Sequence, residues 1–315
     1  MGAVLDQDVI IIGSGPAGLT AATRLAARGL RVLVLEKEDF GGQLKKVEWF
    51  RGHPEYPEGI GGPALAGGLL AAAEQFGVRL EYGAVDEIES FSGCRSVRCD
   101  NGRTYTAGAI IIAAGRQPLH LQIPGEQEYL HRGVMHCVLC DAGLYSNQTV
   151  AVCGGGNTGL TEALLLARYA ARVLVIEQSG ALTARPELQE QALAEPKLKV
   201  FCHAMPLRIL GGKVVEALEI RHLGTGATSI LRLDGIAVAI GWRPATDWLA
   251  DLVSLAEDSS IPVDATMRTE LMHIYAAGDV RGFSERNLPA AIRDGLAAAD
   301  SVLQGYGRLP DGNAQ

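Results

Sequence analysis

The stretch DVIIIGSGPAG at positions 8–18 decides the fold of the N-terminal part of the chain. Its apolar run, Val9 to Ile12, predicts a buried strand, and the glycine loop after it leads into an Ala/Leu-rich segment typical of a helix. The next apolar run, Arg31 to Leu35, predicts a second strand, which is followed by Glu36. The order strand, helix, strand predicts a βαβ unit with parallel strands.

The glycine loop has the spacing that binds the phosphates of a dinucleotide. Gly13 makes the tight turn, Gly15 lets the backbone approach a pyrophosphate, and Gly18 allows the helix to pack closely on the strand. Glu36 is placed to accept hydrogen bonds from ribose hydroxyls. The predicted loop residues of this site are Gly13, Gly15, Pro16, Ala17 and Gly18.

The same pattern returns in the middle of the chain. A predicted strand from Val150 to Cys153 leads into GGGNTG at positions 154–159, then into a helix from Leu160 to Tyr169 and a second strand, Arg172 to Ile176, that ends before Glu177. Glu36 follows Gly13 by 23 residues, and Glu177 follows Gly154 by the same 23. The repeat predicts a second dinucleotide site, formed by Gly154, Gly156, Asn157, Thr158, Gly159 and Glu177. Further along the chain, Ile236 to Ile240 predicts a short strand, and the tail after Tyr306 is expected to be frayed.

Length and composition suit a two-domain α/β protein. The chain has 315 residues, of which 39 are glycine, and its formal net charge is -8. Because phosphate backbones are held by clustered cations, we expect no nucleic acid partner. The apolar runs are far shorter than the ~20 residues that cross a bilayer, so no membrane partner is expected. With no recognisable leader, the expected location is cytoplasmic.

Six cysteines are too few for a secreted disulfide framework. Only Cys137 and Cys140 have CxxC spacing, which brings two sulfurs within bonding distance and is typical of a redox dithiol. Asp141 suits a general acid for the departing thiolate, or alternatively a cap of the following turn. A zinc site on this pair needs further ligands, and although His131 and His136 lie nearby, no second ligand pair follows, so we predict no metal. The cysteines predicted to be structural are Cys94, Cys99, Cys153 and Cys202.

Together these motifs resemble the low-molecular-weight thioredoxin reductases, which are FAD-containing disulfide oxidoreductases. The resemblance covers nearly the whole chain and is carried by Gly13 to Gly18, Gly41 to Leu44, Pro57 to Ile60, Cys137 to Asp141, Gly154 to Gly159 and Ala277 to Val280. It implies an α/β fold of two Rossmann-like, three-layer ββα domains, the second inserted into the first. Residues 1–116 and 246–315 would form the FAD-binding domain, and residues 117–245 a second dinucleotide-binding-like domain that carries the CxxC.

The resemblance also implies a relay in a homodimer. Reduced flavin would pass electrons to the Cys137–Cys140 disulfide, and the dithiol would reduce thioredoxin or a thioredoxin-like protein. Cys140 would be the sulfur on the flavin side and Cys137 the exchanging one. Glu36 would bind the adenosine ribose of FAD. The other residues implied to contact FAD are Gly42, Gln43, Gly115, Gly278, Asp279, Asn287 and Leu288.

The chain departs from this family after its second βαβ unit. NADPH-dependent members carry an HRRxxxR pattern whose cations hold the 2'-phosphate, but here Gln178, Ser179 and Thr183 stand at the matching positions. The Glu177 carboxylate also repels a phosphate, so we expect NADPH to be a poor donor. NADH fits Glu177 and the intact loop. Ferredoxin fits the loss of NADPH determinants, as in the ferredoxin-dependent flavin thioredoxin reductases, and a second FAD fits the shared loop pattern.

Two surface features bear on a partner. A ferredoxin needs a basic face, for which Lys45, Lys46 and Arg51 or Arg24, Arg28 and Arg31 are candidates. Trp49 and Phe50 replace the usual family segment beside the flavin and are expected either to shield the ring or receive a partner, or to pack under the loop. The alternative functions are an oxygen-dependent dithiol oxidase and a flavin-based redox-sensing module.

Overall fold

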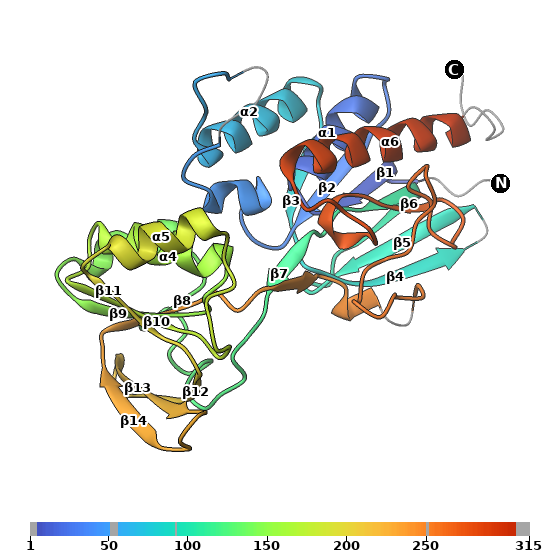
Figure 1. Cartoon of the computed structure of the whole chain (residues 1–315). Coiled ribbons are helices and arrows are strands. Elements are labelled where there is room, and N and C mark those ends of the chain that lie inside the picture. The colour runs from blue at the N-terminus through green and yellow to red at the C-terminus, as the bar shows by residue number, and fades with distance from the viewer. Residues whose placement is uncertain (1–4, 51–55, 92, 250–251, 307–315) are drawn as a thin grey trace. The chain divides into compact units, whose positions relative to one another are not determined.

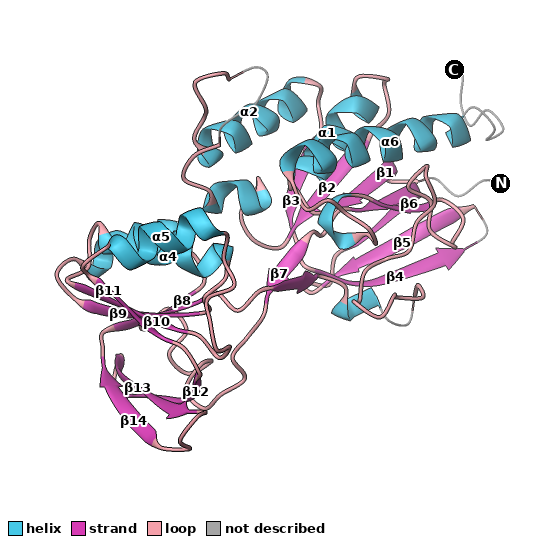
Figure 2. Ribbon diagram, in the orientation of Figure 1, coloured by secondary structure: helices cyan, strands magenta, loops and turns pink. Residues whose placement is uncertain are grey.

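The structure, a computed structural model, describes residues 5–50, 56–91, 93–249 and 252–306 (Figures 1 and 2). The chain falls into two compact units, one made of residues 1–117 and 243–315 and the other of residues 118–242. The two crossings between the units, β7 (Arg116–Pro118) and β16 (Trp242–Pro244), pair as a two-stranded sheet. The second unit is therefore an insertion in the sequence of the first. The limits 116 and 246 for the ligand-binding domains remain a prediction.

A mostly parallel sheet forms the centre of the first unit. Its order is β3-β2-β1-β6-β5-β4, and β17 also pairs with β6. The strands are β1 (Gln7–Ile12), β2 (Val32–Glu36), β3 (Arg79–Tyr82), β4 (Val85–Phe91), β5 (Cys94–Cys99), β6 (Thr104–Ile112) and β17 (Ile274–Ala276). The central strands are apolar along their length because both faces of a parallel sheet are covered.

Alternate residues of β1 enter two different cores. Val9 and Ile11 pack under α1 (Pro16–Ala26) and α6 (Leu288–Tyr306), whereas Ile10 and Ile12 pack with side chains of β4 and β5. Successive side chains of a strand point to opposite faces, so one strand serves both layers. Figure 2 shows α1 and α6 on one side of the parallel strands, while the sheet continues from β6 into the antiparallel strands β5 and β4. Also in this unit are α2 (Gly62–Gln75), η1 (Gly42–Lys46), η3 (Asp247–Leu249) and η4 (Gly278–Val280).

The second unit repeats the three layers. A parallel sheet of order β11-β10-β9-β15-β8 has α4 and α5 on one face and the antiparallel sheet β12-β13-β14 on the other. The bounds are β8 (Val134–Met135), α3 (Val138–Asp141), η2 (Ala142–Tyr145), β9 (Thr149–Cys153), α4 (Asn157–Ala167), β10 (Arg172–Ile176), α5 (Pro186–Ala194), β11 (Leu198–Phe201), β12 (Ala204–Gly211), β13 (Val215–His222), β14 (Thr228–Arg232) and β15 (Gly235–Val238). The predicted α/β fold class, with two Rossmann-like domains, is confirmed.

The sequence misplaced some element ends by two or three residues. Helix α4 begins at Asn157 rather than Leu160, because the last residues of the glycine loop already take helical geometry. Strand β15 ends at Val238 rather than Ile240, before Gly241, whose φ is +120°. The predicted fraying after Tyr306 lies outside the described residues. Among the described helices, none is long and apolar enough to cross a membrane.

Candidate functional site

In the first glycine loop of the first unit, backbone atoms crowd Gly13 and Gly18, whereas the space beside Gly15 is open. Gly13 has φ +104°, and a Cβ there would lie 2.4 Å from the Ala113 oxygen. A Cβ on Gly18 would lie 2.0 Å from the Gly13 oxygen, so only glycine allows α1 to approach the loop this closely. No atom lies within 4 Å of a Cβ built on Gly15. The backbone at Gly15 is therefore accessible to a ligand.

Helix α1 begins at this open position. Pro16 is its first residue, and Gly15 at the N-cap makes no side-chain capping hydrogen bond. The first N–H groups of a helix have no intrahelical acceptor, and the helix dipole favours an anion beside them. Pro16 has no backbone N–H, whereas the N–H groups of Ala17 and Gly18 can donate to a bound anion. The loop fits a pyrophosphate, as predicted for a dinucleotide site.

Glu36 sits against this loop at the end of β2. It is 9% exposed. Its Oε2 accepts hydrogen bonds from the Ser14 N–H at 2.9 Å and the Ser14 hydroxyl at 2.7 Å, and its Oε1 accepts from the Glu38 N–H at 3.0 Å. Several donors thus satisfy a buried carboxylate and fix it beside the loop. The acidic acceptor required for a ribose hydroxyl is in place.

Two distant segments of the chain come to the same helix end. A Cβ on Gly42 would lie 3.0 Å from the Gly15 Cα, and one on Gly278 would lie 3.0 Å from the Ala17 Cβ. Asp279 follows Gly278 and accepts a hydrogen bond from the Ser284 hydroxyl at 3.1 Å. The backbone segments are close enough that side chains would fill the space between them. This cradle fits the extended FAD molecule that the resemblance implies.

A buried ion pair that sequence reasoning missed holds the turn at Gly278. Asp294 of α6 is 3% exposed and accepts from the Gly278 N–H at 3.2 Å. The Arg281 guanidinium donates to the same carboxylate twice, from Nε at 2.6 Å and from Nη2 at 2.8 Å. Because Asp294 and Arg281 lie on different elements, their pairing becomes visible only in the fold. Asp294 therefore positions the segment that contains Asp279.

Of the remaining residues predicted to bind FAD, Gln43, Asn287 and Leu288 make contacts within the first unit, whereas the space beside Gly115 is open. The Gln43 side chain donates to the Arg116 carbonyl at 3.4 Å. The Asn287 side chain accepts from the Ala290 N–H at 2.9 Å and so caps the start of α6. Leu288 packs on the small cluster around Leu44. No atom lies within 4 Å of a Cβ built on Gly115, whose φ is +64°. Their contact with FAD remains a prediction.

Trp49 and Phe50 behave differently from one another. Phe50 pairs with Ile60 as an isolated bridge and joins the cluster around Leu44 and Leu65, as expected for packing under the loop. Trp49 is 53% exposed. Shielding of a flavin or reception of a partner therefore stays a prediction for Trp49, whereas Phe50 has a packing role.

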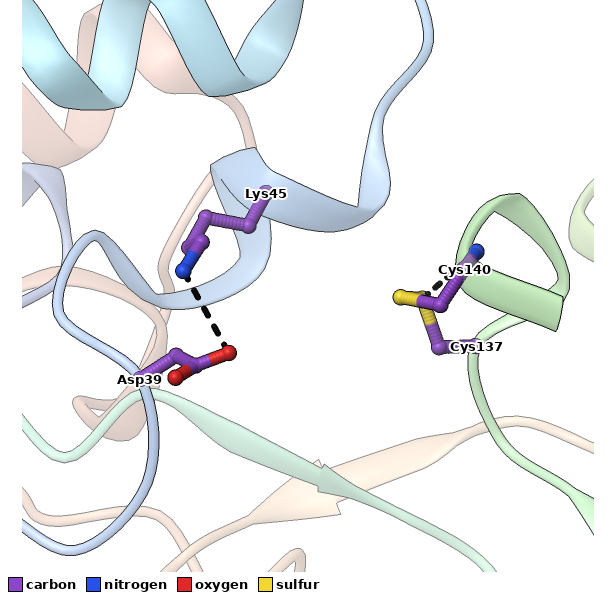
Figure 3. The surroundings of a disulfide bond; sticks show 4 residues. All are labelled: Asp39, Lys45, Cys137 and Cys140. Carbon is purple, nitrogen blue, oxygen red and sulfur yellow. Dashed lines mark hydrogen bonds and ion pairs between the residues drawn. A yellow bond between two sulfur atoms is a disulfide. The ribbon is translucent and has the colours of Figure 1, made fainter.

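Three of the candidate cations of the basic faces pair with neighbouring carboxylates. Lys45 lies 3.3 Å from Asp39, as Figure 3 shows. The Arg24 guanidinium is 2.9 Å from Asp300, and that of Arg31 is 2.8 Å from Asp8. Arg51 lies outside the described residues. Paired cations contribute little net positive potential, so these groups give weak support to a ferredoxin surface.

The second glycine loop reproduces the geometry of the first. Gly154 has φ +123°, and a Cβ on Gly159 would lie 2.0 Å from the Gly154 oxygen. Glu177 is 8% exposed; its Oε2 accepts from the Gly155 N–H at 2.6 Å and its Oε1 from the Ser179 N–H at 2.7 Å. The Asn157 side chain accepts from the Arg185 N–H at 2.8 Å. Both units therefore place a buried glutamate against a glycine loop, but a Cβ on Gly156, the counterpart of Gly15, would lie 3.5 Å from the Thr183 hydroxyl oxygen.

The CxxC segment lies at the start of α3 in the second unit. Cys137 and Cys140 form a disulfide with their Cα atoms 5.3 Å apart (Figure 3). The Cys137 sulfur accepts a hydrogen bond from the Cys140 N–H at 3.3 Å. Cys140 is exposed and Cys137 half-buried. Asp141 stands at the N-cap of η2 but makes no side-chain capping hydrogen bond. The carboxyl next to the second sulfur is therefore not engaged in capping that turn.

The four other cysteines are free thiols. Cys153 lies in β9, and its burial raises the pKa of the thiol to about 12. We therefore expect iodoacetamide at pH 8 to leave Cys153 unlabelled in the native protein, because the thiolate is the reactive form. Peptide mass spectrometry after timed labelling measures this. Labelling of Cys153 as fast as that of the half-buried Cys94 would contradict the expectation.

Comparisons with known proteins agree with this geometry. Residues 7–295 match the family model described as pyridine nucleotide-disulphide oxidoreductase. The chain is 35% identical to the thioredoxin reductase of Listeria innocua, over 94% of this chain and 92% of that protein. It is also 35% identical to the bifunctional thioredoxin reductase/thioredoxin of Mycobacterium leprae, of whose length it spans 64%. The crystal structure of Lactococcus lactis thioredoxin reductase superposes with a TM-score of 0.88 at 33% identity, covering 96% of this chain and 100% of that one.

Proposed function

Because the chain belongs to the pyridine nucleotide-disulphide oxidoreductase family, as an enzyme similar to the flavoprotein thioredoxin reductases, we propose that it passes electrons through Cys137 and Cys140 to thioredoxin or a thioredoxin-like protein. The observation that carries the proposal is the disulfide itself, formed by the one CxxC of the sequence. The family implies FAD as the cofactor. The first glycine loop supplies a cradle that fits it.

We assign the binding of FAD to the first unit. When bound, FAD would supply the two electrons that reduce the Cys137–Cys140 disulfide. The N-terminus of α1 receives the pyrophosphate, and Glu36 accepts from the adenosine ribose. Asp279, on the turn fixed by Asp294, is the proposed acceptor for ribityl hydroxyls. The protein's own contribution would be to hold the FAD in a fixed position throughout the redox cycle.

The disulfide chemistry falls to three neighbouring residues. Uptake of two electrons and two protons opens the disulfide to the Cys137 and Cys140 thiols. The Cys137 thiolate then attacks a disulfide of the partner protein to form a mixed disulfide, and the Cys140 thiolate attacks the Cys137 sulfur to release the reduced partner. The Cys140 N–H, which points at the Cys137 sulfur, stabilises the attacking thiolate. Asp141 is the proposed proton donor to a departing thiolate.

The electron donor is proposed to be a molecule other than NADPH. Glu177, directly after β10, is buried and hydrogen-bonded to the loop. An acidic residue at this position of a dinucleotide fold binds the ribose 2'-hydroxyl, and its charge disfavours a 2'-phosphate there. Gln178, Ser179 and Thr183 offer no cation to a 2'-phosphate. A ribose with a free 2'-hydroxyl suits the carboxylate, as in NADH or in a second FAD. Ferredoxin remains the third candidate, with weaker support from the paired cations.

Anaerobic titration of the oxidised holoprotein separates these donors. We expect micromolar NADPH to leave the 450 nm flavin band largely intact, because an uncompensated 2'-phosphate would lie beside Glu177. NADH, if it is the donor, bleaches the band; reduced ferredoxin is the third arm of the same titration. Rapid bleaching by NADPH would contradict the Glu177 argument. Counting flavins per chain in the same sample tests the second FAD, since two per chain assign the second loop to flavin.

The two alternative functions are distinguished by two further measurements. An oxygen-dependent dithiol oxidase would consume oxygen when supplied with a dithiol substrate. A redox-sensing module would show no electron transfer from reduced FAD to the disulfide in a stopped-flow experiment. Reduction of a thioredoxin disulfide by the chemically reduced flavoprotein, without oxygen consumption, is the outcome expected here.

A further inference from the structure

Two imidazoles and one carboxylate meet in the second unit, outside the residues of the proposed relay. They belong to His120, Glu126 and His136, and one potential ligand atom from each lies within 4.8 Å of the others. The His120 Nδ1 is 3.4 Å from the Glu126 Oε1. The rings of His120 and His136 are nearly perpendicular, with centroids 5.2 Å apart. The three side chains therefore converge on one small volume.

The carboxylate of this cluster is buried and held in a fixed orientation. Glu126 is 2% exposed. Its Oε1 accepts from the Leu121 N–H at 3.0 Å and its Oε2 from the Gln122 N–H at 2.8 Å. These donors are neutral, and each carboxylate oxygen keeps a further lone pair. A buried negative charge is costly unless a positive one compensates it. Among the described ion pairs, the partner of Glu126 is His120.

We propose that His120, Glu126 and His136 bind a divalent transition metal ion of the zinc class. Zinc takes imidazole nitrogen and carboxylate oxygen at about 2.0 to 2.2 Å, so two ligand atoms on one tetrahedral ion lie about 3.3 Å apart. The separation of 3.4 Å between the His120 Nδ1 and the Glu126 Oε1 is close to this value. Because His120 is exposed, its ring can adjust around the ion and leaves a path from solvent. Imidazole ligands select against Mg²⁺ and Ca²⁺, which take oxygen.

Three protein ligands leave the fourth position of a tetrahedral ion for water. His136 directly precedes Cys137 in the chain. An ion at this site would tie the loop of residues 120–126 to the segment that enters the disulfide. The site uses no cysteine, so it differs from the zinc site on the CxxC that the sequence argued against. His120 and Glu126 carry no metal-site signal in the sequence, because they stand apart from His136.

The direct test is zinc binding to the holoprotein with its disulfide closed, so that Cys137 and Cys140 cannot act as ligands. The sample carries no histidine tag, and isothermal titration calorimetry with Zn²⁺ is the measurement. We expect one ion per chain for the wild type. His120→Gln and His136→Gln are each expected to weaken binding by roughly 10-fold or more, since each removes one of three protein ligands. His131→Gln is the matched control, because His131 is exposed and outside the cluster, and should bind zinc as the wild type does.

The proposal is overturned if calorimetry detects no binding to the wild type at about 100 micromolar Zn²⁺. A dissociation constant above that concentration would be too weak for a built site. It is equally overturned if both cluster variants bind zinc as tightly as the wild type does, since the ion would then lie elsewhere. His120→Gln changes an exposed side chain, so it is expected to fold, and circular dichroism checks this. Calorimetry measures no turnover, so the outcome is independent of the proposed electron relay.

Discussion

Cys140→Ser is expected to lower thioredoxin reduction by at least about 1000-fold while FAD remains bound. The variant cannot form the disulfide, so electrons from the flavin have no two-electron acceptor on the protein. The remaining Cys137 thiol also lacks the sulfur that resolves a mixed disulfide. FAD should be retained because the cradle at Gly15, Gly42 and Gly278 lies in the other unit. Turnover with a thioredoxin substrate and the flavin absorbance of the purified variant measure the two effects.

Cys202→Ser is the matched control for this experiment. Cys202 is a free cysteine of the same unit, so the substitution removes one thiol without touching the disulfide. Near wild-type turnover is expected. Mixing Cys140→Ser with oxidised thioredoxin should in addition trap a disulfide between Cys137 and the partner, seen as a shifted band on a non-reducing gel. Substantial turnover in Cys140→Ser would refute the assigned role, as would a partner captured through a different cysteine.

The parts of the molecule that the sequence predicted well are those with local rules. A glycine loop between a strand and a helix, followed at a set distance by a glutamate, depends on residues that are near one another in the sequence. Both copies of this motif were predicted. The family and the α/β fold followed from these motifs and from the CxxC. Helix ends were less predictable, since α4 starts inside the glycine loop, where sequence alone shows only turn-forming residues.

The parts that the sequence did not predict depend on contacts between distant elements. Asp294 looks like an ordinary polar residue of an amphipathic helix until α6 packs beside the turn at Gly278. His120, Glu126 and His136 become neighbours only when the loop after β7 folds against the end of β8. The difference between Trp49 and Phe50 is likewise tertiary, because Phe50 has a bridge to Ile60 and a cluster to join.

Asp294→Ala is expected to lower the free energy of unfolding by about 3 to 5 kcal/mol, the usual effect of removing one partner of a buried ion pair. The Arg281 guanidinium would keep its charge in a largely buried position without its hydrogen-bonded carboxylate, and the Gly278 N–H would lose its acceptor. Urea unfolding followed by circular dichroism measures the change. We also expect a lower FAD content, because the turn that carries Asp279 loses its anchor to α6.

Two comparisons make this second prediction specific. Asp300→Ala removes a carboxylate from the same helix, but its pair with Arg24 is only partly buried, and such pairs contribute little, so its urea midpoint should stay near that of the wild type. Asp294→Asn keeps an acceptor for the Gly278 N–H while removing the charge, so it should retain more FAD than Asp294→Ala. If Asp294→Ala unfolds at the wild-type urea concentration and binds FAD fully, the turn at Gly278 is held by other contacts. The role assigned to the buried pair would then be wrong, because no unpaired charge can be left in that position without a measurable cost.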